Sequence, residues 1–184
     1  MRVKPYLPTR VGFDALTELD HVSWSTLHHA YGQGVVGEDV SGDVARCLVL
    51  LRDDPATALS GEGLWSNVCH QGTVYEASAY ALPFIAAVAA GCVPAELRSL
   101  LASLLGFIAV GGSYVAPRGS SAGSHGGGVD VLIRETVGRC DEYLASIERA
   151  DEELALLIAA VRLVTADPSE QNRQAAYDLI DPET

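Results

Sequence analysis

Residues 64–91 read LWSNVCHQGTVYEASAYALPFIAAVAAG, and they join a polar cluster to the most apolar stretch of the chain. The polar cluster consists of Asn67, His70, Gln71, Thr73 and Tyr75. From about residue 75 to residue 90 most side chains are apolar, which is typical of a helix buried at the centre of a protein. The most apolar part is shorter than the roughly 18 residues of a membrane span and contains Pro83, so no span is predicted.

Apolar residues recur at helical spacing on both sides of this segment. The predicted stripes are Trp24, Leu27, His28 and Tyr31; Val44, Cys47, Leu48 and Leu51; Leu97, Leu100, Leu101, Leu104, Leu105 and Ile108; Ile133, Val137, Cys140, Leu144 and Ile147; and Leu154, Leu157, Ile158, Val161 and Val164. Asp54-Pro55 and Asp167-Pro168 each place an N-cap residue before a proline, which marks the start of a helix. The sequence therefore predicts an all-α protein with about seven to eight helices in antiparallel pairs.

The spacing of the helix starts suggests a repeat. Asp43 and Glu76 are 33 residues apart, and Glu76 and Val129 are 53 apart, or 35 without the 18-residue Gly-rich loop at residues 111–128. Two-helix units of this length are typical of α-solenoids. We therefore predict one helical-repeat domain over residues 1–184, folded as a short HEAT-like α-α superhelix. Residues 1–22 are predicted to form an N-terminal arm that is extended or loosely docked over residues 1–12 and contains a short turn of helix at Phe13 to Leu19. Residues 111–128 are predicted to form a flexible loop.

Charge limits the classes of partner. The net charge is −12, and residues 135–184 hold 12 acidic residues against 4 arginines, a balance of −8. Phosphate binding needs a basic patch, so nucleic acid is not expected as a ligand. An acidic surface attracts basic partners, although the same charge also serves solubility alone. The first ten residues, MRVKPYLPTR, lack the apolar segment of a secretory signal, so the expected location is the cytoplasm and no membrane partner is predicted.

No motif for a known chemistry is present. Lys4 is the only lysine, which excludes a P-loop, and neither a G-x-S-x-G elbow nor an H-E-x-x-H helix occurs. Adjacent pairs such as Cys69-His70 and His28-His29 are poor chelators, because neighbouring side chains on a helix diverge. We therefore predict no catalytic residue, no cofactor and no metal, and we expect the cysteines to be buried apolar residues.

The polar cluster allows two interpretations. Its side chains could cap the ends of two successive helices, with His28 and His70 buried and hydrogen-bonded between helices. Alternatively, the cluster and nearby aromatic residues could form a contact surface, since aromatic and amide groups together suit binding. The candidate binding residues are His28, Tyr31, Trp65, Asn67, His70, Gln71, Thr73 and Tyr75.

Three segments carry a resemblance to a known family. WSTLHHAYG at residues 24–32, NVCHQGTVYEAS at residues 67–78 and ALPF at residues 81–84 resemble bacterial, actinomycete-type HEAT-repeat-like or armadillo-like α-solenoid proteins, most of them uncharacterised. The resemblance covers roughly residues 23–110. It implies an α-α superhelix and, by analogy, protein binding.

These observations favour a non-catalytic protein-interaction module that binds a basic protein partner, in one version an immunity or antitoxin-like protein. The alternative is a small-molecule enzyme or accessory enzyme that uses a pocket formed by His28, His70 and Tyr75. A pocket with these residues in its lining would favour the enzyme, whereas an open acidic groove would favour the interaction module. The oligomeric state stays open.

Overall fold

The structure, a computed structural model, describes residues 3–35, 43–115 and 125–180. Most of these residues are helical, which confirms the all-α class. The α-helices are α1 (Val44–Asp53), α2 (Pro55–Ala58), α3 (Leu64–Val68), α4 (Glu76–Ala90), α5 (Ala95–Val110), α6 (Val129–Arg139), α7 (Asp141–Ala150), α8 (Ala155–Ala166) and α9 (Glu170–Ile180). Short 3-10 helices are η1 (Gly12–His21), η2 (Trp24–Thr26), η3 (Gly126–Gly128) and η4 (Glu152–Leu154).

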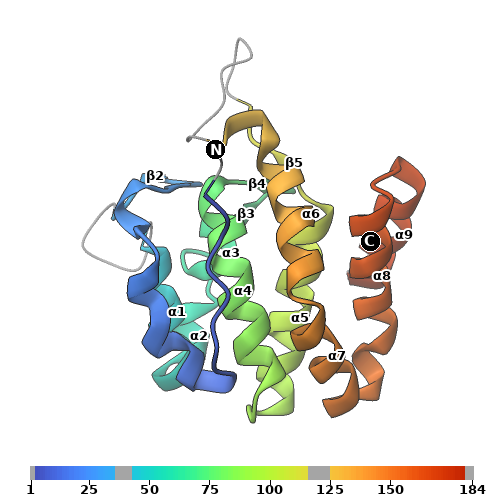
Figure 1. Cartoon of the computed structure of the whole chain (residues 1–184), viewed down its shortest axis with the longest axis horizontal. Coiled ribbons are helices and arrows are strands. Elements are labelled where there is room, and N and C mark those ends of the chain that lie inside the picture. The colour runs from blue at the N-terminus through green and yellow to red at the C-terminus, as the bar shows by residue number, and fades with distance from the viewer. Residues whose placement is uncertain (1–2, 36–42, 116–124, 181–184) are drawn as a thin grey trace.

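Helix α4 lies at the centre of the molecule (Figure 1). Every residue from Glu76 to Ala89 is buried, because η1, α1, α3, α5, α6 and α7 all pack against this helix. The predicted central helix is thus confirmed. In a solenoid each unit touches mainly its neighbours, whereas α4 contacts elements from both halves of the chain. This arrangement therefore does not establish the HEAT-like superhelix.

The predicted apolar stripes explain how the surrounding helices dock. From α1 onward their side chains face the core, with Leu100 as an exposed exception, and Asp54 caps α2 by accepting the Thr57 N–H at 3.1 Å. The stripe from Ile133 to Ile147 is buried as predicted, but it belongs to two helices, since α6 ends at Arg139 and α7 starts at Asp141.

The helix predicted from the stripe between Trp24 and Tyr31 is wrong. A single 3-10 turn, η2, is followed by a hairpin of β1 (His28–His29) and β2 (Gly32–Gln33), in which His28 pairs with Gln33. The buried His29 ring closes this hairpin, because its Nε2 lies 2.8 Å from the Gly34 carbonyl and its Nδ1 accepts the Tyr31 N–H at 3.2 Å. These local bonds replace the helical hydrogen bonds that the apolar spacing predicted.

The His-Gln-Gly-Thr segment is also a hairpin. Strand β3 (Cys69–His70) pairs antiparallel with β4 (Thr73–Val74), and the turn residues Gln71 and Gly72 have φ of 52° and 74°. A two-residue turn with both φ positive follows the twist of the strands, so it forms a tight hairpin. The prediction that this segment connects α3 and α4 is correct, but it does so through strands rather than as a cap between helix ends.

The Gly-rich segment is ordered at both of its ends. Strand β5 (Gly112–Ser113) pairs in parallel with β4, and η3 precedes α6. Gly111 is required here, since a Cβ on it would lie 2.5 Å from Val74 Cγ1. The predicted flexible loop is therefore wrong for residues 111–115 and 125–128, while residues 116–124 lie outside the described residues.

The N-terminal arm is docked against the helices, not loose. Residues 3–11 run in front of α4 in Figure 1, before η1 packs against the same helix. Arg139 Nη1 donates to the Pro5 carbonyl at 2.8 Å, Tyr143 donates to the Pro8 carbonyl, and Tyr80 donates to the Val3 carbonyl at 3.1 Å. Side chains that are distant in the sequence thus fix a segment that has no helical period.

One ion-pair network joins the acidic helices. Arg162 on α8 donates to Asp141 at 2.7 Å and to Glu148 at 2.6 Å, both on α7. These two carboxylates of the acidic segment 135–184 are therefore engaged by Arg162, which links α7 to α8.

Reversing both carboxylates, Asp141→Lys with Glu148→Lys, should lower the free energy of unfolding by about 1–2 kcal/mol, because the two ion pairs are replaced by repulsion from Arg162. Urea denaturation measures this loss, which should shrink in 1 M salt as screening increases. The control reverses Glu135 and Glu152, two exposed acids with the same total charge. Equal losses in both double variants would contradict a specific role for Arg162.

Candidate functional site

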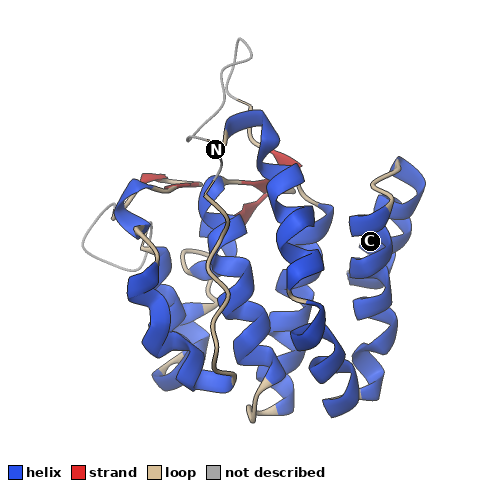
Figure 2. Ribbon diagram, viewed as in Figure 1, coloured by secondary structure: helices blue, strands red, loops and turns tan. Residues whose placement is uncertain are grey.

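Most of the predicted binding residues gather at one end of the helices, where the short strands lie (Figure 2). We call this the hairpin end, and define it as β1 to β5 with their turns. The β1–β2 hairpin is linked to α3 and α4: the Ala30 N–H donates to the Asn67 carbonyl at 3.2 Å, and the His28 N–H donates to Glu76 Oε2 at 3.4 Å. The sequence assigned His28 and Tyr31 to a helix and His70, Gln71 and Thr73 to a connection between helices, whereas both segments are hairpins.

Three of the predicted binding residues make contacts within the fold. Asn67 is fully buried, and its Nδ2 donates to the Gly63 carbonyl at 2.8 Å within the α3 turn. Trp65 packs edge-on against Phe107, with ring centroids 5.4 Å apart. Tyr75 is 7% exposed at the N-terminus of α4. The Asn67 side chain therefore bonds within α3 and does not bridge the ends of α3 and α4.

The two neighbouring histidines have exchanged their expected roles. The sequence placed His28 on the packed face and His29 outward, whereas His29 is buried and His28 is half-buried. Burial lowers the pKa of His29, so its ring stays neutral while it holds β1 to β2. The exchange follows from the strand, in which successive side chains point to opposite faces.

Four rings form what we call the aromatic face: Tyr31, His70, Tyr75 and Tyr114. The Tyr31 and His70 ring centroids are 6.3 Å apart, and Tyr75 stacks on Tyr114 at 5.5 Å. Tyr31 is 41% exposed, and the turn residue Gln71 beside His70 is exposed while Thr73 is half-buried. Burial raises the pKa of Tyr75, with a smaller contribution from Tyr114, so Tyr75 acts as a neutral ring.

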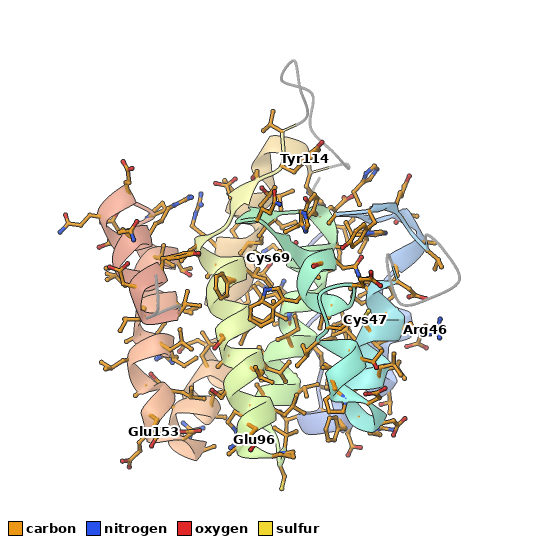
Figure 3. The ribbon with its side chains drawn as sticks, turned by 180° about the vertical axis from the view of Figure 1, so that it is seen from behind. Arg46, Cys47, Cys69, Glu96, Tyr114 and Glu153 are labelled. Atoms are coloured by element: carbon orange, nitrogen blue, oxygen red, sulfur yellow. The ribbon has the colours of Figure 1, made fainter. Side chains whose placement is uncertain are left out.

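Tyr114 lies at the hairpin end, above Cys69 in Figure 3. It was missed because residues 111–128 were interpreted as a flexible loop. Tyr114 could have been identified as an aromatic residue shortly after a long apolar helix, in the run Gly-Gly-Ser-Tyr-Val.

A separate cleft of about 820 Å³ lies between the N-terminal arm and the start of α4. We call it the arm cleft. It is lined by Val3, Lys4, Tyr6, His21, Val22, Ser23, Thr26, Leu27, Glu76, Tyr80 and His125. This lining does not include His28, His70 or Tyr75, so the arm cleft is not the pocket that the enzyme alternative predicted.

Glu76, Tyr80 and His125 meet in the arm cleft. Glu76 and Tyr80 share one face of α4, since they are four residues apart. His125 Nε2 lies 3.6 Å from Glu76 Oε1 and 3.2 Å from the Tyr80 hydroxyl. Burial raises the pKa of Tyr80, and the Glu76 carboxylate adds to the rise, so the phenol keeps its proton.

The hydrogen bonds fix the tautomer of His125. Because the Tyr80 hydroxyl donates its only hydrogen to the Val3 carbonyl, the His125 Nε2 must carry the hydrogen that lies between the two rings. Its Nδ1 is buried and has no hydrogen-bond partner among the described residues. His125 therefore donates from Nε2 toward the Tyr80 oxygen. It escaped prediction from the sequence because it lies in the Gly-rich segment.

The buried thiols do not form a reactive site. Cys47, Cys69 and Cys140 are buried as predicted, and burial raises their pKa to about 12, about 11 and about 12. The prediction is wrong for Cys92, which is exposed. Among the described residues, no group of three or more His, Cys, Asp or Glu side chains could hold a metal ion. In the same part of the chain, no helix is long and apolar enough to cross a membrane.

No protein-family description, curated protein or solved structure matches this chain. Function must therefore be inferred from the aromatic face, the arm cleft and the charge of the molecule.

Proposed function

We propose that this protein is a non-catalytic interaction module, and that it binds a basic protein partner through the aromatic face. The observation that carries the proposal is the 41% exposed Tyr31, whose ring centroid lies 6.3 Å from that of His70 and whose hairpin is tied to α3 by the bond from Ala30 to Asn67. Tyrosine is enriched among residues that dominate binding energy, and a fixed ring loses little entropy on binding. The exposed Val115, next to Tyr114, adds apolar surface.

The acidic charge supports a basic partner through its field rather than through direct contact. Exposed carboxylates remain on the helices after Val129 once the Arg162 pairs are set aside: Glu135, Glu142, Glu152, Glu153, Asp167, Glu170 and Asp178. Glu153 lies at the end of the molecule opposite to Tyr114 (Figure 3). The electrostatic field of these carboxylates extends over the whole molecule, so it raises the association rate of a cationic protein without direct contact.

The resemblance to HEAT-like solenoid proteins agrees with this proposal, since such proteins bind others. The superhelix, the immunity-like role and the cytoplasmic location remain proposals of the same kind.

The double variant Tyr31→Ala with His70→Ala should lose its protein partner. We expect affinity purification of the tagged wild-type chain from its host to enrich one protein of high isoelectric point. The double variant should retain less than about a tenth of it, because truncating a central aromatic contact costs about 2 kcal/mol or more. Quantitative mass spectrometry measures the ratio.

The matched control is Leu156→Ala, which removes an exposed apolar side chain from α8, away from the hairpins. It should retain the partner. The same basic protein recovered in equal amounts with all three chains would reject the aromatic face as the contact, and an acidic partner would reject the proposed charge complementarity.

A further inference from the structure

We propose that the outer face of α8 is a self-association surface, through which two copies of this chain pair about a two-fold axis. We call this surface the leucine stripe, and define it as Leu156, Ala159, Leu163 and Ala166 on α8 with Leu179 on the neighbouring α9. It is separate from the aromatic face and does not depend on the protein partner proposed for that face.

The leucine stripe is exposed although it is apolar. Leu156 is 70% exposed, Leu163 49% and Leu179 47%. Among the described residues these are three of the four exposed leucines, and all three lie on the last two helices, at one side of the molecule (Figure 1). Single exposed leucines are ordinary, whereas a continuous apolar patch indicates a contact with another macromolecule.

Their packing on α5 places the leucines of the two helices side by side. A Cβ on Gly106 of α5 would lie 2.8 Å from Ile180 Cδ1 and 3.3 Å from Leu157 Cδ1, so these two side chains reach the same point of α5. Leu179 and Leu156 directly precede them in the sequence and are exposed, so they stand at the same level of α9 and α8. The patch therefore spans both helices.

The size of the patch sets the expected strength of the pairing. Helix α8 has 12 residues and is therefore about 18 Å long, and two packed helices together are about 20 Å wide. A surface of these dimensions belongs to the small, weak class of specific interfaces. We therefore expect a dissociation constant on the order of 10–100 µM.

The pattern of the stripe is complementary to itself. Its four α8 positions alternate leucine and alanine at intervals of three and four residues, the spacing of helices that pack along each other. A two-fold axis that crosses α8 near Ala159 brings Leu156 of one copy against Leu163 of the other, and the reverse. The small Ala159 side chain on the axis lets the two helices approach closely.

The charge of α8 favours a second copy over a basic protein at this face. The structure describes the whole of α8, and Arg162 is its only charged residue. This guanidinium is already bound by Asp141 at 2.7 Å and by Glu148 at 2.6 Å. The stripe thus offers no carboxylate to a basic partner, whereas an uncharged face of the same pattern covers it without burying an unpaired charge.

Salt should strengthen the pairing. Each copy carries a net charge of −12, and the exposed Glu152 and Glu153 directly precede α8, so two copies repel each other at low salt. Screening reduces this repulsion, and the dissociation constant should fall between about 0.05 M and about 0.5 M salt. Binding of a basic protein at the aromatic face should change in the opposite direction.

The experiment is sedimentation velocity of the purified full chain from about 1 µM to about 500 µM, a range that brackets the expected dissociation constant. The wild type should pass from monomer to dimer. Leu156→Ala should raise the dissociation constant at least about tenfold, because each dimer loses two leucine side chains from its interface. The matched control, Leu100→Ala, removes an exposed leucine from α5 and should leave the dimer unchanged.

Charges at Ala159 test the two-fold axis itself. Ala159→Glu and Ala159→Lys each place two like charges at the axis, so each variant alone should stay monomeric. Mixed in equal amounts they should associate, because opposite charges then face each other. Ala159 is exposed and both replacements are good helix formers, so melting curves should match that of the wild type.

A wild type that stays monomeric would overturn the proposal, as would a dimer that Leu156→Ala leaves intact or that Leu100→Ala weakens equally. Assemblies larger than dimers, or an Ala159 mixture that does not associate, would reject the two-fold pairing. The Tyr31 and His70 double variant should still form the dimer, since loss of the dimer in that variant would place the contact at the aromatic face.

Discussion

Gly91→Ala is expected to lower the free energy of unfolding by about 3 kcal/mol. This is the largest loss of stability that we predict for a substitution that adds one methyl group. Gly91 ends α4 and lies against Gly12, the first residue of η1. A Cβ on Gly91 would lie 2.2 Å from the Gly12 backbone N and 2.3 Å from its Cα. Both are main-chain atoms, so no side chain can rotate away, and η1 must separate from α4.

Urea denaturation monitored by circular dichroism measures this loss. The matched control is Gly138→Ala on α6, where an added Cβ meets no atom within 4 Å. Alanine is favoured over glycine in a helix by about 1 kcal/mol, so the control should be neutral or more stable than the wild type. Equal stability of Gly91→Ala and Gly138→Ala would show that η1 is not packed against the end of α4.

The sequence predicted well wherever the structural signal is local. Asp54 and Pro55 marked the start of α2, and the unbroken apolar run marked α4 as central. Capping and helical spacing act within about one or two turns, so they can be recognised without knowing the neighbours. The buried stripes of α1, α5 and α8 follow from the same local rules.

The strands were missed because they are only two residues long. Such strands have no alternation to detect, and the β3–β4 turn uses Gln-Gly where a two-residue hairpin usually shows Asn-Gly or Asp-Gly. A helical interpretation of His28 and Tyr31 therefore fitted the spacing equally well. The contacts that decide between the two, such as the bond from Ala30 to Asn67, join segments more than thirty residues apart.

The arm cleft was beyond prediction for the same reason. Tyr80 and His125 are 45 residues apart in the sequence, and Val3 of the N-terminal arm lines the same cleft. Because His125 lies among glycine and serine residues, it was not chosen as a candidate site residue. The same composition also permits the 3-10 turn η3 and the short strand β5. Composition predicts the flexibility of an isolated segment and not the contacts that it finds in the folded protein.

The N-terminal arm illustrates how one buried carboxylate can order a segment without secondary structure. Glu18 on η1 is 8% exposed, and it accepts the Tyr6 hydroxyl at 2.6 Å, the Thr9 N–H at 2.9 Å and the Thr9 hydroxyl at 2.9 Å. The bond from Tyr6, assisted by those from Thr9, lowers the pKa of Glu18 to about 2. The same bond raises the pKa of Tyr6, because its hydroxyl must keep the shared proton.

Glu18→Gln should therefore destabilise the protein by about 2–3 kcal/mol at neutral pH, since the charge-assisted bonds are lost and the amide hydrogens of the substituted side chain would face the Thr9 donors. Asp20→Asn, an exposed neutral substitution on the same helix, should change stability by less than about 0.5 kcal/mol. Urea denaturation of the three chains at pH 7 gives these differences.

The pH dependence has a definite direction. The pKa of Glu18 is lowered from 4.5 to about 2 in the folded protein, so its contribution is complete above pH 4.5 and is lost as the pH falls toward 2. The stability difference between wild type and Glu18→Gln should therefore be constant from pH 7 to about pH 5 and shrink toward zero near pH 2. A difference that stays constant over the whole acid range would mean that the Glu18 charge does not hold the arm, and that Tyr143 and Arg139 hold it without help.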